Sequence, residues 1–489
     1  MNREFEQLLD KVRREGGEIR SDSREVGKGD IFVAVPGVNA DGARFIPPAV
    51  EAGASTIVCL PGGAEAEAAR AAGCTVVHHD DPREALWRLA EARWHTGSLP
   101  LRVLGVTGTN GKTTSAYLLE HLFTATGHKV GVLGTVSYRW PGHCEAAPLT
   151  TPDPLRVHAM LAAMAQAGVD IAVMEVSSHA LEQQRVCGVP FAGASFSNLT
   201  QDHLDFHQDM ESYFRAKSRL FLELPRADKV MAINGDDPWG RRLLELCPRA
   251  LSFGLQKALP QQRHLWGELL SAGTDGCHLR MHLDGQQWEL RSPLVGAFNA
   301  SNLLSVQALA LELGLMPDDL RHLEDFHGVC GRLERVPNAR KLHVFVDYAH
   351  TPDAVENILR SVKEYTKGRL ICLFGCGGNR DATKRPKMAK AAAKYADFLV
   401  VTSDNPRDEE PEAIIADILA GLTDSDVPYE VVTDRKEAIL RSMQLAQPED
   451  VIVLAGKGHE DYQVLKGGVH IHMDEREIVR ECLPLVPKR

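Results

Sequence analysis

The residues with the clearest chemical meaning stand at positions 108–114, which read Gly-Thr-Asn-Gly-Lys-Thr-Thr. An apolar run over residues 101–106 precedes them, and a helical pattern over residues 115–126 follows. A strand that leads through a glycine loop into a helix is typical of nucleotide binding, because the backbone N–H groups and the helix N-terminus face a phosphate. In such a loop Lys112 would reach the outer phosphates, and the Thr113 hydroxyl would hold Mg²⁺.

This loop is a variant of the usual phosphate-binding pattern. The pattern asks for a glycine five residues before Gly111, but Val106 stands there and Gly105 is one place away. The alternative interpretation is a tight turn with a surface lysine. We favour a nucleotide site, because the strand, the glycines, the Lys-Thr pair and the helix occur together. The expected contacts in the loop are Gly108, Thr109, Asn110, Gly111, Lys112, Thr113 and Thr114.

Two further segments carry groups that could hold a metal ion. Glu175 closes an expected strand over residues 171–176, and a carboxylate at that place beside a phosphate loop is a usual Mg²⁺ ligand. The alternative is a polar residue that merely ends the strand. Residues 198–205, which include His203, are dense in metal-capable groups. Lys217 lies on a helical pattern over residues 210–224, where a lysine is by default a solvated surface charge.

Length and composition limit the class of protein. A chain of 489 residues corresponds to roughly three domains, and 44% hydrophobic with 25% charged residues is ordinary for a soluble protein. A net charge of −11 argues against broad binding to nucleic acid or anionic membranes. No apolar run approaches membrane-spanning length, and the charged N-terminus lacks a secretory pattern. Ten scattered cysteines without a paired zinc pattern indicate reduced thiols, so we expect a cytoplasmic protein.

The elements around these residues predict an α/β fold with three domains. Residues 1–97 would form a small α/β domain, and the Thr96–Pro100 stretch would be a linker. Residues 98–335 would form a central P-loop α/β ATPase domain with a largely parallel sheet. Residues 336–489 would form a Rossmann-like doubly wound domain. The expected strands span residues 31–35, 56–60, 75–78, 129–133, 171–176, 229–233, 342–346, 370–374, 398–402, 429–432 and 451–454.

Four polar loops directly follow strands of the third domain. They span residues 347–350, 375–380, 404–407 and 456–460. Ligands of doubly wound sheets bind at the carboxyl ends of the strands. The sequence therefore predicts a second binding face, separate from the phosphate loop.

Taken together, these motifs resemble the signature of the Mur ligase family in order and spacing, over nearly the whole chain. The matching positions are the loop at 108–114, Glu175, His203, Lys217, Asn299, Asn302, Arg332, Asp347 and His350. The resemblance implies that ATP phosphorylates the terminal carboxylate of UDP-N-acetylmuramoyl-L-alanyl-D-glutamate. An amine would then attack the acyl phosphate, which gives an amide, ADP and phosphate.

The family resemblance also implies roles for individual residues. One Mg²⁺ would be held by Thr113 and Glu175, and a second would lie near His203. Lys217 would carry a carbamate derived from CO₂, which turns a cation into a hard oxygen ligand for Mg²⁺. Further nucleotide contacts would come from Asn299, Arg332 and Asp347.

The first domain resembles the family's UDP-sugar pocket. Its implied contacts are Ser21, Ser23, Val38, Asn39 and Ala40, and ordinary loop polarity is the alternative reading of these residues. The implied contacts to the muramoyl-peptide are Thr150, Thr151, Ser177, Gln183 and Arg185. Among them, Arg185 could pair with a substrate carboxylate.

The loop Asp404-Asn405-Pro406-Arg407 resembles that of family members that add meso-diaminopimelate. This amino acid has a carboxylate at the far end of its side chain, which Arg407 can bind bidentately and which L-lysine lacks. The alternative is that Arg407 only pairs with Asp408. The resemblance implies that the remaining amino-acid contacts are Arg380, Gly456 and Glu460, with Glu460 accepting the substrate ammonium.

Parts of this set of motifs are also compatible with other functions. The nearest are the L-lysine-adding ligase of the same family and folylpolyglutamate synthase, which lacks a counterpart of the first domain and of the Thr150-Thr151-Pro152 motif. A P-loop motor or transport ATPase would need a hydrolytic site of which the sequence shows no motif. A nucleotide sensor would be expected to have lost Lys112, Glu175, His203 or Lys217. We expect small-molecule substrates only, no nucleic-acid or membrane partner, and a monomer.

Overall fold

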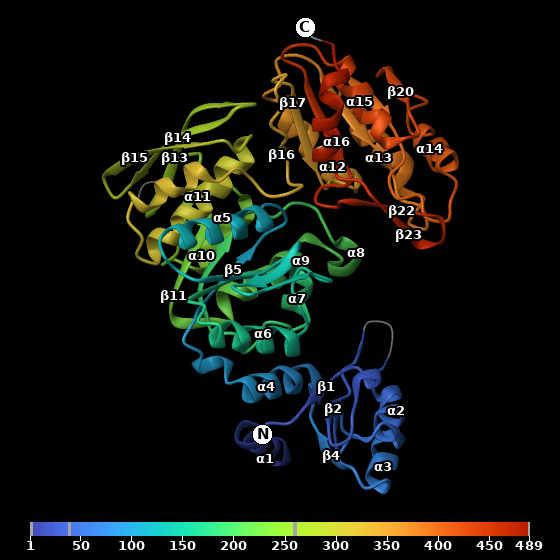
Figure 1. Cartoon of the computed structure of the whole chain (residues 1–489). Coiled ribbons are helices and arrows are strands. Elements are labelled where there is room, and N and C mark those ends of the chain that lie inside the picture. Colours follow the sequence, from blue (N-terminus) through green and yellow to red (C-terminus); the bar gives the residue numbers. More distant parts are fainter. Residues whose placement is uncertain (1–2, 38–40, 258–261, 488–489) are drawn as a thin grey trace. The chain divides into compact units, whose positions relative to one another are not determined.

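The computed structural model describes residues 3–37, 41–257 and 262–487. The chain forms two compact units (Figure 1). The first contains the chain up to Trp266 together with Leu303–His322, and the second contains Gly267–Asn302 and the chain from Leu323 onward. Both are α/β, as predicted. Among the described residues, no helix combines the length and the apolar character that a membrane crossing requires.

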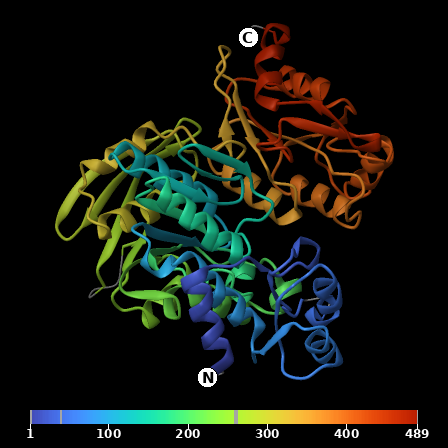
Figure 2. The same ribbon diagram turned by 60° about the horizontal axis from the view of Figure 1, so that its bottom comes forward.

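The N-terminal part of the first unit is a four-stranded parallel sheet in the order β1-β2-β3-β4. Helices α1 and α4 pack on one face of this sheet, and α2 and α3 pack on the other (Figure 2). Asp81 begins α4 by accepting hydrogen bonds from the N–H groups of Arg83 and Glu84. The strands are β1 (Ile19–Arg20), β2 (Ile31–Val33), β3 (Thr56–Cys59) and β4 (Thr75–His78). The helices are α1 (Arg3–Glu15), α2 (Ile46–Glu51), α3 (Ala64–Ala71) and α4 (Pro82–Trp94).

The rest of the first unit is built on a larger sheet with the order β12-β11-β10-β5-β9-β6-β7-β8. Neighbouring strands from β12 to β6 are parallel, whereas β7 and β8 form an antiparallel hairpin that the sequence patterns did not predict. The strands are β5 (Arg102–Thr107), β6 (Val130–Leu133), β7 (Ser137–Trp140), β8 (His143–Ala146), β9 (Ile171–Glu175), β10 (Phe191–Phe196), β11 (Pro225–Asn234) and β12 (Leu251–Gly254).

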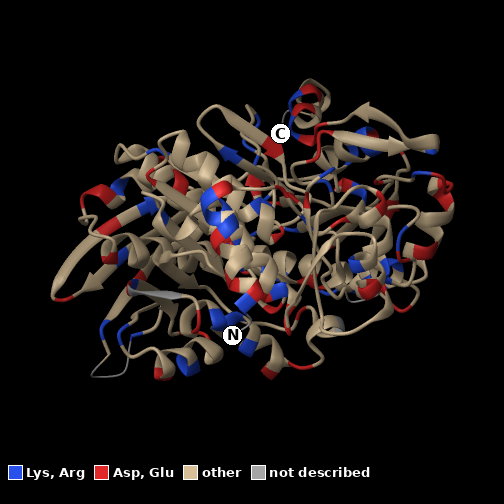
Figure 3. Cartoon of the chain, turned by 90° about the horizontal axis from the view of Figure 1, so that it is seen from below, with Lys and Arg blue, Asp and Glu red and all other residues tan. Residues whose placement is uncertain are grey.

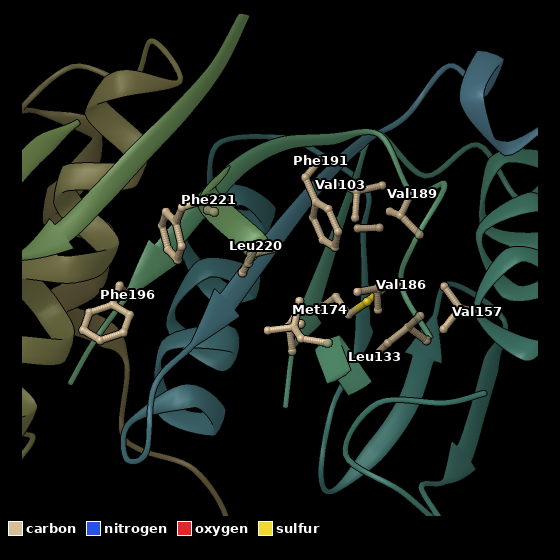
Figure 4. Packing of buried hydrophobic residues seen from close by; sticks show 14 of the residues in the cluster. Val103, Leu133, Val157, Met174, Val186, Val189, Phe191, Phe196, Leu220 and Phe221 are labelled. Atoms are coloured by element: carbon tan, nitrogen blue, oxygen red, sulfur yellow. The ribbon is translucent and has the colours of Figure 1, made fainter. Parts of the chain in front are cut away.

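One face of this sheet is a continuous apolar core (Figure 4). Side chains from the strands, such as Val103, Met174 and Phe191, meet Val157 of α6 and Leu220 of α9. On the opposite face lies α5, whose first residue is Lys112, three residues earlier than predicted. The helices are α5 (Lys112–Ala125), α6 (Pro154–Gln166), α7 (Ser178–Glu182), α8 (Leu204–His207), α9 (Met210–Leu222) and α10 (Pro238–Leu246).

Among the elements that contribute to both units are β13 (His264–Gly273) and α11 (Ala297–Glu312). In the second unit, β14 (Gly276–Leu283) and β15 (Gln286–Ser292) form an antiparallel hairpin. The sequence patterns did not predict these strands. The stretch Thr96–Pro100, predicted as a linker, includes a short 3₁₀ turn over Thr96–Ser98.

The second unit also contains a six-stranded sheet in the order β16-β17-β21-β18-β19-β20, in which β17 to β20 run parallel. Helices α12, α13 and α14 cover one face, and α15 and α16 cover the other, which confirms the doubly wound prediction. The strands are β16 (Glu334–Arg335), β17 (His343–Asp347), β18 (Leu370–Phe374), β19 (Phe398–Val401), β20 (Tyr429–Val431), β21 (Val451–Ala455), and the separate hairpin β22 (Tyr462–Leu465) and β23 (Val469–His472). The helices are α12 (Pro352–Lys363), α13 (Lys384–Ala393), α14 (Pro411–Leu419), α15 (Arg435–Leu445) and α16 (Glu475–Cys482).

Acidic and basic positions are interleaved along the helices (Figure 3). Cations that could meet an anionic ligand therefore have to be sought at individual loops.

Candidate active site

The glycine loop between β5 and α5 has a backbone that only glycine adopts easily. Gly108 and Gly111 have φ values of +144° and +87°. A Cβ at Gly108 would lie 2.0 Å from the Ser197 Oγ, so no side chain fits there. The loop is fixed by the segment after β10, because the N–H groups of Thr109 and Asn110 each donate over 2.9 Å to Asn198.

Thr113 and Glu175, the two predicted magnesium ligands, are in direct contact. The Thr113 Oγ1 donates to Glu175 Oε2 over 2.9 Å, and the Thr135 N–H and hydroxyl also donate to this carboxylate. Glu175 is 1% exposed, and no lysine or arginine in the described part of the chain lies within ion-pair distance of it. A buried carboxylate that has hydroxyl neighbours but no cation fits a divalent metal ion.

Lys112 and Lys217 converge on the glycine loop. The Lys112 Nζ donates to the carbonyls of Gly108 and Thr109 at 2.9 and 2.8 Å, and the Lys217 Nζ donates to the Gly108 carbonyl at 2.8 Å. Lys217 is 1% exposed, so the default reading as a surface charge is wrong. Burial lowers the pKa of Lys217 well below the ordinary lysine value, and the charge of Lys112 adds to this effect.

A signal for the burial of Lys217 was present in the sequence. Tyr213 and Phe221 stand four residues before and after it, which puts Lys217 on the apolar face of α9. The Tyr213 hydroxyl bonds to the Thr109 Oγ1 over 3.1 Å, so the helix is tied to the glycine loop.

His203 lies on the other side of Tyr213, with 6.2 Å between the ring centroids. Its Nε2 is 3.4 Å from the Asp202 carboxylate, and its ring meets that of His179 at 4.9 Å. Within the described ranges, no set of three or more His, Cys, Asp or Glu side chains could hold a metal ion. The structure thus joins Thr113 to Glu175, and Lys217 to the loop, but does not join all four predicted ligands in one set.

The predicted muramoyl-peptide contacts form a hydrogen-bonded chain next to Glu175. The Thr151 Oγ1 donates to the Glu175 carbonyl over 2.7 Å and accepts from the Ser177 N–H over 3.1 Å. Arg185 donates to the Thr151 carbonyl and, through Nε and Nη2, to Gln183 Oε1. Thr150 accepts from the Thr135 hydroxyl over 3.2 Å, which closes the chain back to Glu175.

Gln183 and Arg185 also line a cavity of about 340 Å³. Its other walls include Val35, Pro36 and Arg83 of the N-terminal part of the first unit. Arg83 was not singled out from the sequence.

The structure describes only two of the five N-terminal contacts predicted for the UDP-sugar. Ser21 and Ser23 follow β1 and are not among the residues that line this cavity. The predicted contacts Val38, Asn39 and Ala40 lie outside the described residues.

The second unit holds the three other predicted nucleotide contacts. The Asn299 Nδ2 donates to the Val295 carbonyl over 2.9 Å. The Arg332 Nε is buried without a hydrogen-bond partner in the described chain, which leaves a donor for an anion. Asp347 accepts from two backbone N–H groups, and burial raises its pKa to about 6 although Arg332 opposes the change.

The four polar loops of the doubly wound sheet line a single cavity of about 240 Å³. They follow β17, β18, β19 and β21, whose carboxyl ends meet because these strands are neighbours. The predicted clustering of the four loops is therefore confirmed. The cavity brings together six of the predicted amino-acid contacts, namely Arg380, Asp404, Asn405, Arg407, Gly456 and Glu460. The seventh, Pro406, does not line it. Tyr348, Cys376 and Lys384 line the cavity but were not predicted as amino-acid contacts.

Arg407 is held so that its charge remains available. Its Nη1 donates to the Gly378 carbonyl over 2.9 Å. In the described residues no carboxylate lies within ion-pair distance of it, and the Asp408 Oδ1 accepts instead from the Gly467 N–H. Pairing with Asp408, the alternative reading of this arginine, is not what the structure shows.

A phosphate-type glycine loop on a parallel sheet, together with a small polar pocket on a doubly wound sheet, fits an enzyme that uses a nucleotide and a polar second substrate. Three family profiles match the sequence: "Mur ligase family, catalytic domain" over residues 17–94, "Mur ligase middle domain" over 106–310, and "Mur ligase, glutamate ligase domain" over 331–458. The chain belongs to the Mur ligase family, which confirms the resemblance seen in the sequence.

Individual relatives are similar along almost their whole length. UDP-N-acetylmuramoyl-L-alanyl-D-glutamate--2,6-diaminopimelate ligase of Lawsonia intracellularis is 50% identical, covering 94% of this chain and 95% of the relative. The ligase of the same name from Thermosynechococcus vestitus is 45% identical, covering 95% and 92%. A solved structure, also of a UDP-N-acetylmuramoyl-L-alanyl-D-glutamate--2,6-diaminopimelate ligase, is 32% identical with a TM-score of 0.69, covering 96% of this chain and 94% of that one.

Proposed function

We propose that this protein joins meso-2,6-diaminopimelate to UDP-N-acetylmuramoyl-L-alanyl-D-glutamate while ATP is converted to ADP and phosphate, a step in making peptidoglycan precursors. The observation that carries the choice of amino acid is Arg407, a cation in the wall of the four-loop cavity that has no carboxylate partner among the described residues. Diaminopimelate supplies the missing carboxylate, and L-lysine would leave the guanidinium unpaired. The names of the relatives point to the same substrate.

The first chemical step is phosphoryl transfer to the substrate carboxylate. Two anions have to approach each other, so cations must neutralise both. Lys112 would face the γ-phosphate, and Mg²⁺ held by Thr113 and Glu175 would supply Lewis-acid charge stabilisation. Asn299, Arg332 and Asp347 are the proposed nucleotide contacts of the second unit.

For Lys217 we propose carbamylation by CO₂. Only a neutral amine attacks CO₂, and burial, which lowers the pKa of Lys217, favours that neutral form. The N–C bond forms, one proton leaves the nitrogen, and the carbamate gains two oxygens suited to Mg²⁺ near His203. Isotope-labelled CO₂ followed by NMR would show the carbamate resonance without any activity measurement, and Lys217→Ala should lack it.

The second chemical step is attack of the diaminopimelate amine on the acyl phosphate, which expels phosphate. Diaminopimelate has an ammonium and a carboxylate at each end. The cavity would hold the end that does not react, with Arg407 and Arg380 facing its carboxylate and Glu460 accepting from its ammonium. Arg185 would pair with a carboxylate of the muramoyl-peptide, whose UDP end would lie on the N-terminal part.

This assignment divides the chain into a UDP-sugar part (residues 1–97), an ATP part (98–335) and an amino-acid part (336–489). We propose that the enzyme works as a monomer in the cytoplasm.

The test is phosphate release from ATP in the presence of Mg²⁺. Release should require both UDP-N-acetylmuramoyl-L-alanyl-D-glutamate and meso-diaminopimelate, and L-lysine should substitute poorly. Equal turnover with lysine would make this the lysine-adding ligase, and turnover with a folate and glutamate instead would make it a folylpolyglutamate synthase.

A further inference from the structure

Lys457, in the loop that follows β21, is a fully buried cation at the back of the amino-acid cavity. Its side chain is 0% exposed, and it is not among the residues that line the cavity. A substrate that enters the cavity therefore cannot reach its ammonium. Whatever Lys457 does for the reaction, it does through the residues that it contacts.

The contacts of Lys457 are with three proposed ligands of diaminopimelate. Its Nζ lies 2.5 Å from the Asn405 Oδ1, 3.2 Å from the Asp404 Oδ1 and 3.4 Å from the Glu460 Oε2. A fourth contact, at 2.8 Å, is with the Tyr462 carbonyl at the start of the β22–β23 hairpin. One ammonium thus links the loops after β19 and β21 to the hairpin.

Asn405 shows what this link achieves. Its Oδ1 accepts from Lys457 and from the Val464 N–H, so its Nδ2 must point the other way. That Nδ2 donates to the Glu460 Oε2 over 3.1 Å. Lys457 and the Val464 N–H therefore set the amide orientation of Asn405 together, and the amide in turn holds Glu460.

The charge of Lys457 also favours the ionised form of Asp404. Burial alone would raise the pKa of Asp404, but Lys457 and then Arg435 outweigh it and hold this pKa below the ordinary value, with a smaller contribution from His350. The other ionisable side chains around the two carboxylates include Glu475, Cys376, Tyr348, Tyr462 and His459, and Arg380, Lys384 and Arg407 line the same cavity. Without Lys457, Asp404 and Glu460 would be two like charges that share one small cavity.

We propose that Lys457 is a positioning residue for diaminopimelate: it fixes Asn405 and Glu460 and keeps the pair of carboxylates, Asp404 and Glu460, ready to receive the substrate ammonium. This inference rests on the proposed function, because it takes diaminopimelate as the occupant of the cavity. Lys457 balances one of the two negative charges, so the pair keeps one negative charge for a further cation. This matches the single free ammonium of the substrate half that Arg407 would bind by its carboxylate.

The experiment compares Lys457→Met with the wild type in steady-state phosphate release. We expect the KM for diaminopimelate to rise roughly 10- to 100-fold, the loss expected for charge-assisted hydrogen bonds, while the KM for ATP stays within about twofold. The acid limb of kcat/KM for diaminopimelate should move to higher pH, because Asp404 loses the cation that favours its ionised form. A purely structural role would lower the active fraction but leave KM and the pH profile unchanged.

Two further variants keep the test decisive. Lys363→Met removes a lysine of the same sheet domain that pairs with Asp397 and does not line the cavity, so its KM values should not change. If Lys457→Met does not fold because Asp404 is left buried and unpaired, Lys457→Met/Asp404→Asn removes both charges and should fold with the same weak diaminopimelate binding. An unchanged KM in a folded variant, or failure of both variants to fold, overturns the proposal. Absence of diaminopimelate-dependent turnover in the wild type would instead refute the proposed function.

Discussion

The glycine loop and the amino-acid cavity are both predicted to bind charged ligands, but they are built in opposite ways. The glycine loop is a single stretch of backbone, and its shape depends on positive φ values at Gly108 and Gly111. The cavity is assembled from four loops that come from widely separated parts of the chain, and side chains rather than backbone provide its charges.

This difference shows where each site is sensitive. At the loop, reactivity depends on the groups that face the phosphate, so single substitutions there should affect turnover. At the cavity, a buried network holds the ligands: Arg435 donates to the carbonyls of Ser403 and Ala455 and pairs with Glu475, while Lys457 contacts Asp404, Asn405 and Glu460. Substitutions there should affect KM and specificity.

The largest expected effect is that of Lys112→Ala. The variant loses a charge that faces the transferring phosphoryl group, so we expect kcat to fall on the order of 10³-fold or more. The KM for diaminopimelate should change little, since the cavity is untouched. Lys11→Ala, at an exposed position of α1, is the matched control and should behave as wild type. Near-normal turnover of Lys112→Ala would remove the loop from the mechanism.

Lys217→Ala should come next, with a loss of about 10²- to 10³-fold in kcat. A short carboxylate such as acetate can occupy the vacated metal-ligand position, so added acetate should restore part of the activity. The measurement is phosphate release with and without acetate at constant ionic strength. Full activity of the variant without acetate would contradict the carbamate.

The sequence predicted the glycine loop itself better than it predicted the residues that support the two sites. The pattern at positions 108–114 is local, so the strand, the loop and the helix could be predicted together. The clustering of the four loops was also predictable, because neighbouring parallel strands end at the same edge of a sheet.

The support around these sites was not predicted. The β22–β23 hairpin was not among the predicted strands, although Val469–His472 alternates apolar and polar residues after the turn signal Gly467-Gly468. Lys457 looks like any loop lysine until the fold buries it. A lysine on a helical pattern is expected at the surface by default, and the metal-binding role predicted for Lys217 comes from the family resemblance. The apolar neighbours on α9 are the local signal for its burial.

Arg407→Ala tests whether this side chain determines the preference of the cavity for diaminopimelate over L-lysine. We expect kcat/KM for diaminopimelate to fall about 10²-fold, whereas kcat/KM for L-lysine should stay within a few-fold of the wild-type value. The preference for diaminopimelate over L-lysine therefore becomes smaller. Arg360→Ala removes an exposed arginine from α12 and should leave both values unchanged. If the ratio of the two kcat/KM values is the same in Arg407→Ala and in wild type, Arg407 does not determine specificity.

The smallest effect concerns two buried aspartates that follow or end strands of one sheet and have opposite pKa changes. Asp347 has its pKa raised from the ordinary 3.8 to about 6, chiefly by burial, so the folded protein binds its proton more tightly than the unfolded chain does. Its contribution to stability is therefore present at low pH and is lost as the pH rises from about 4 through about 6. Asp404, held below the ordinary value by Lys457 and Arg435, contributes stability above pH 4 and loses it as the pH falls further.

Replacing each aspartate by asparagine should separate these two behaviours in thermal unfolding. Asp404→Asn removes one of the carboxylates that face Lys457 and Arg435, and Glu460 and Glu475 remain beside them. Its Tm should therefore fall by several degrees at pH 7 and by less at pH 3. Asp347→Asn cannot ionise, so between pH 4 and 6 its Tm should decline less than that of the wild type, and its deficit should shrink as the pH rises. Parallel curves of Tm against pH for the wild type and both variants would mean that neither carboxylate changes its proton affinity on folding. The opposite pKa changes of Asp347 and Asp404 would then be refuted.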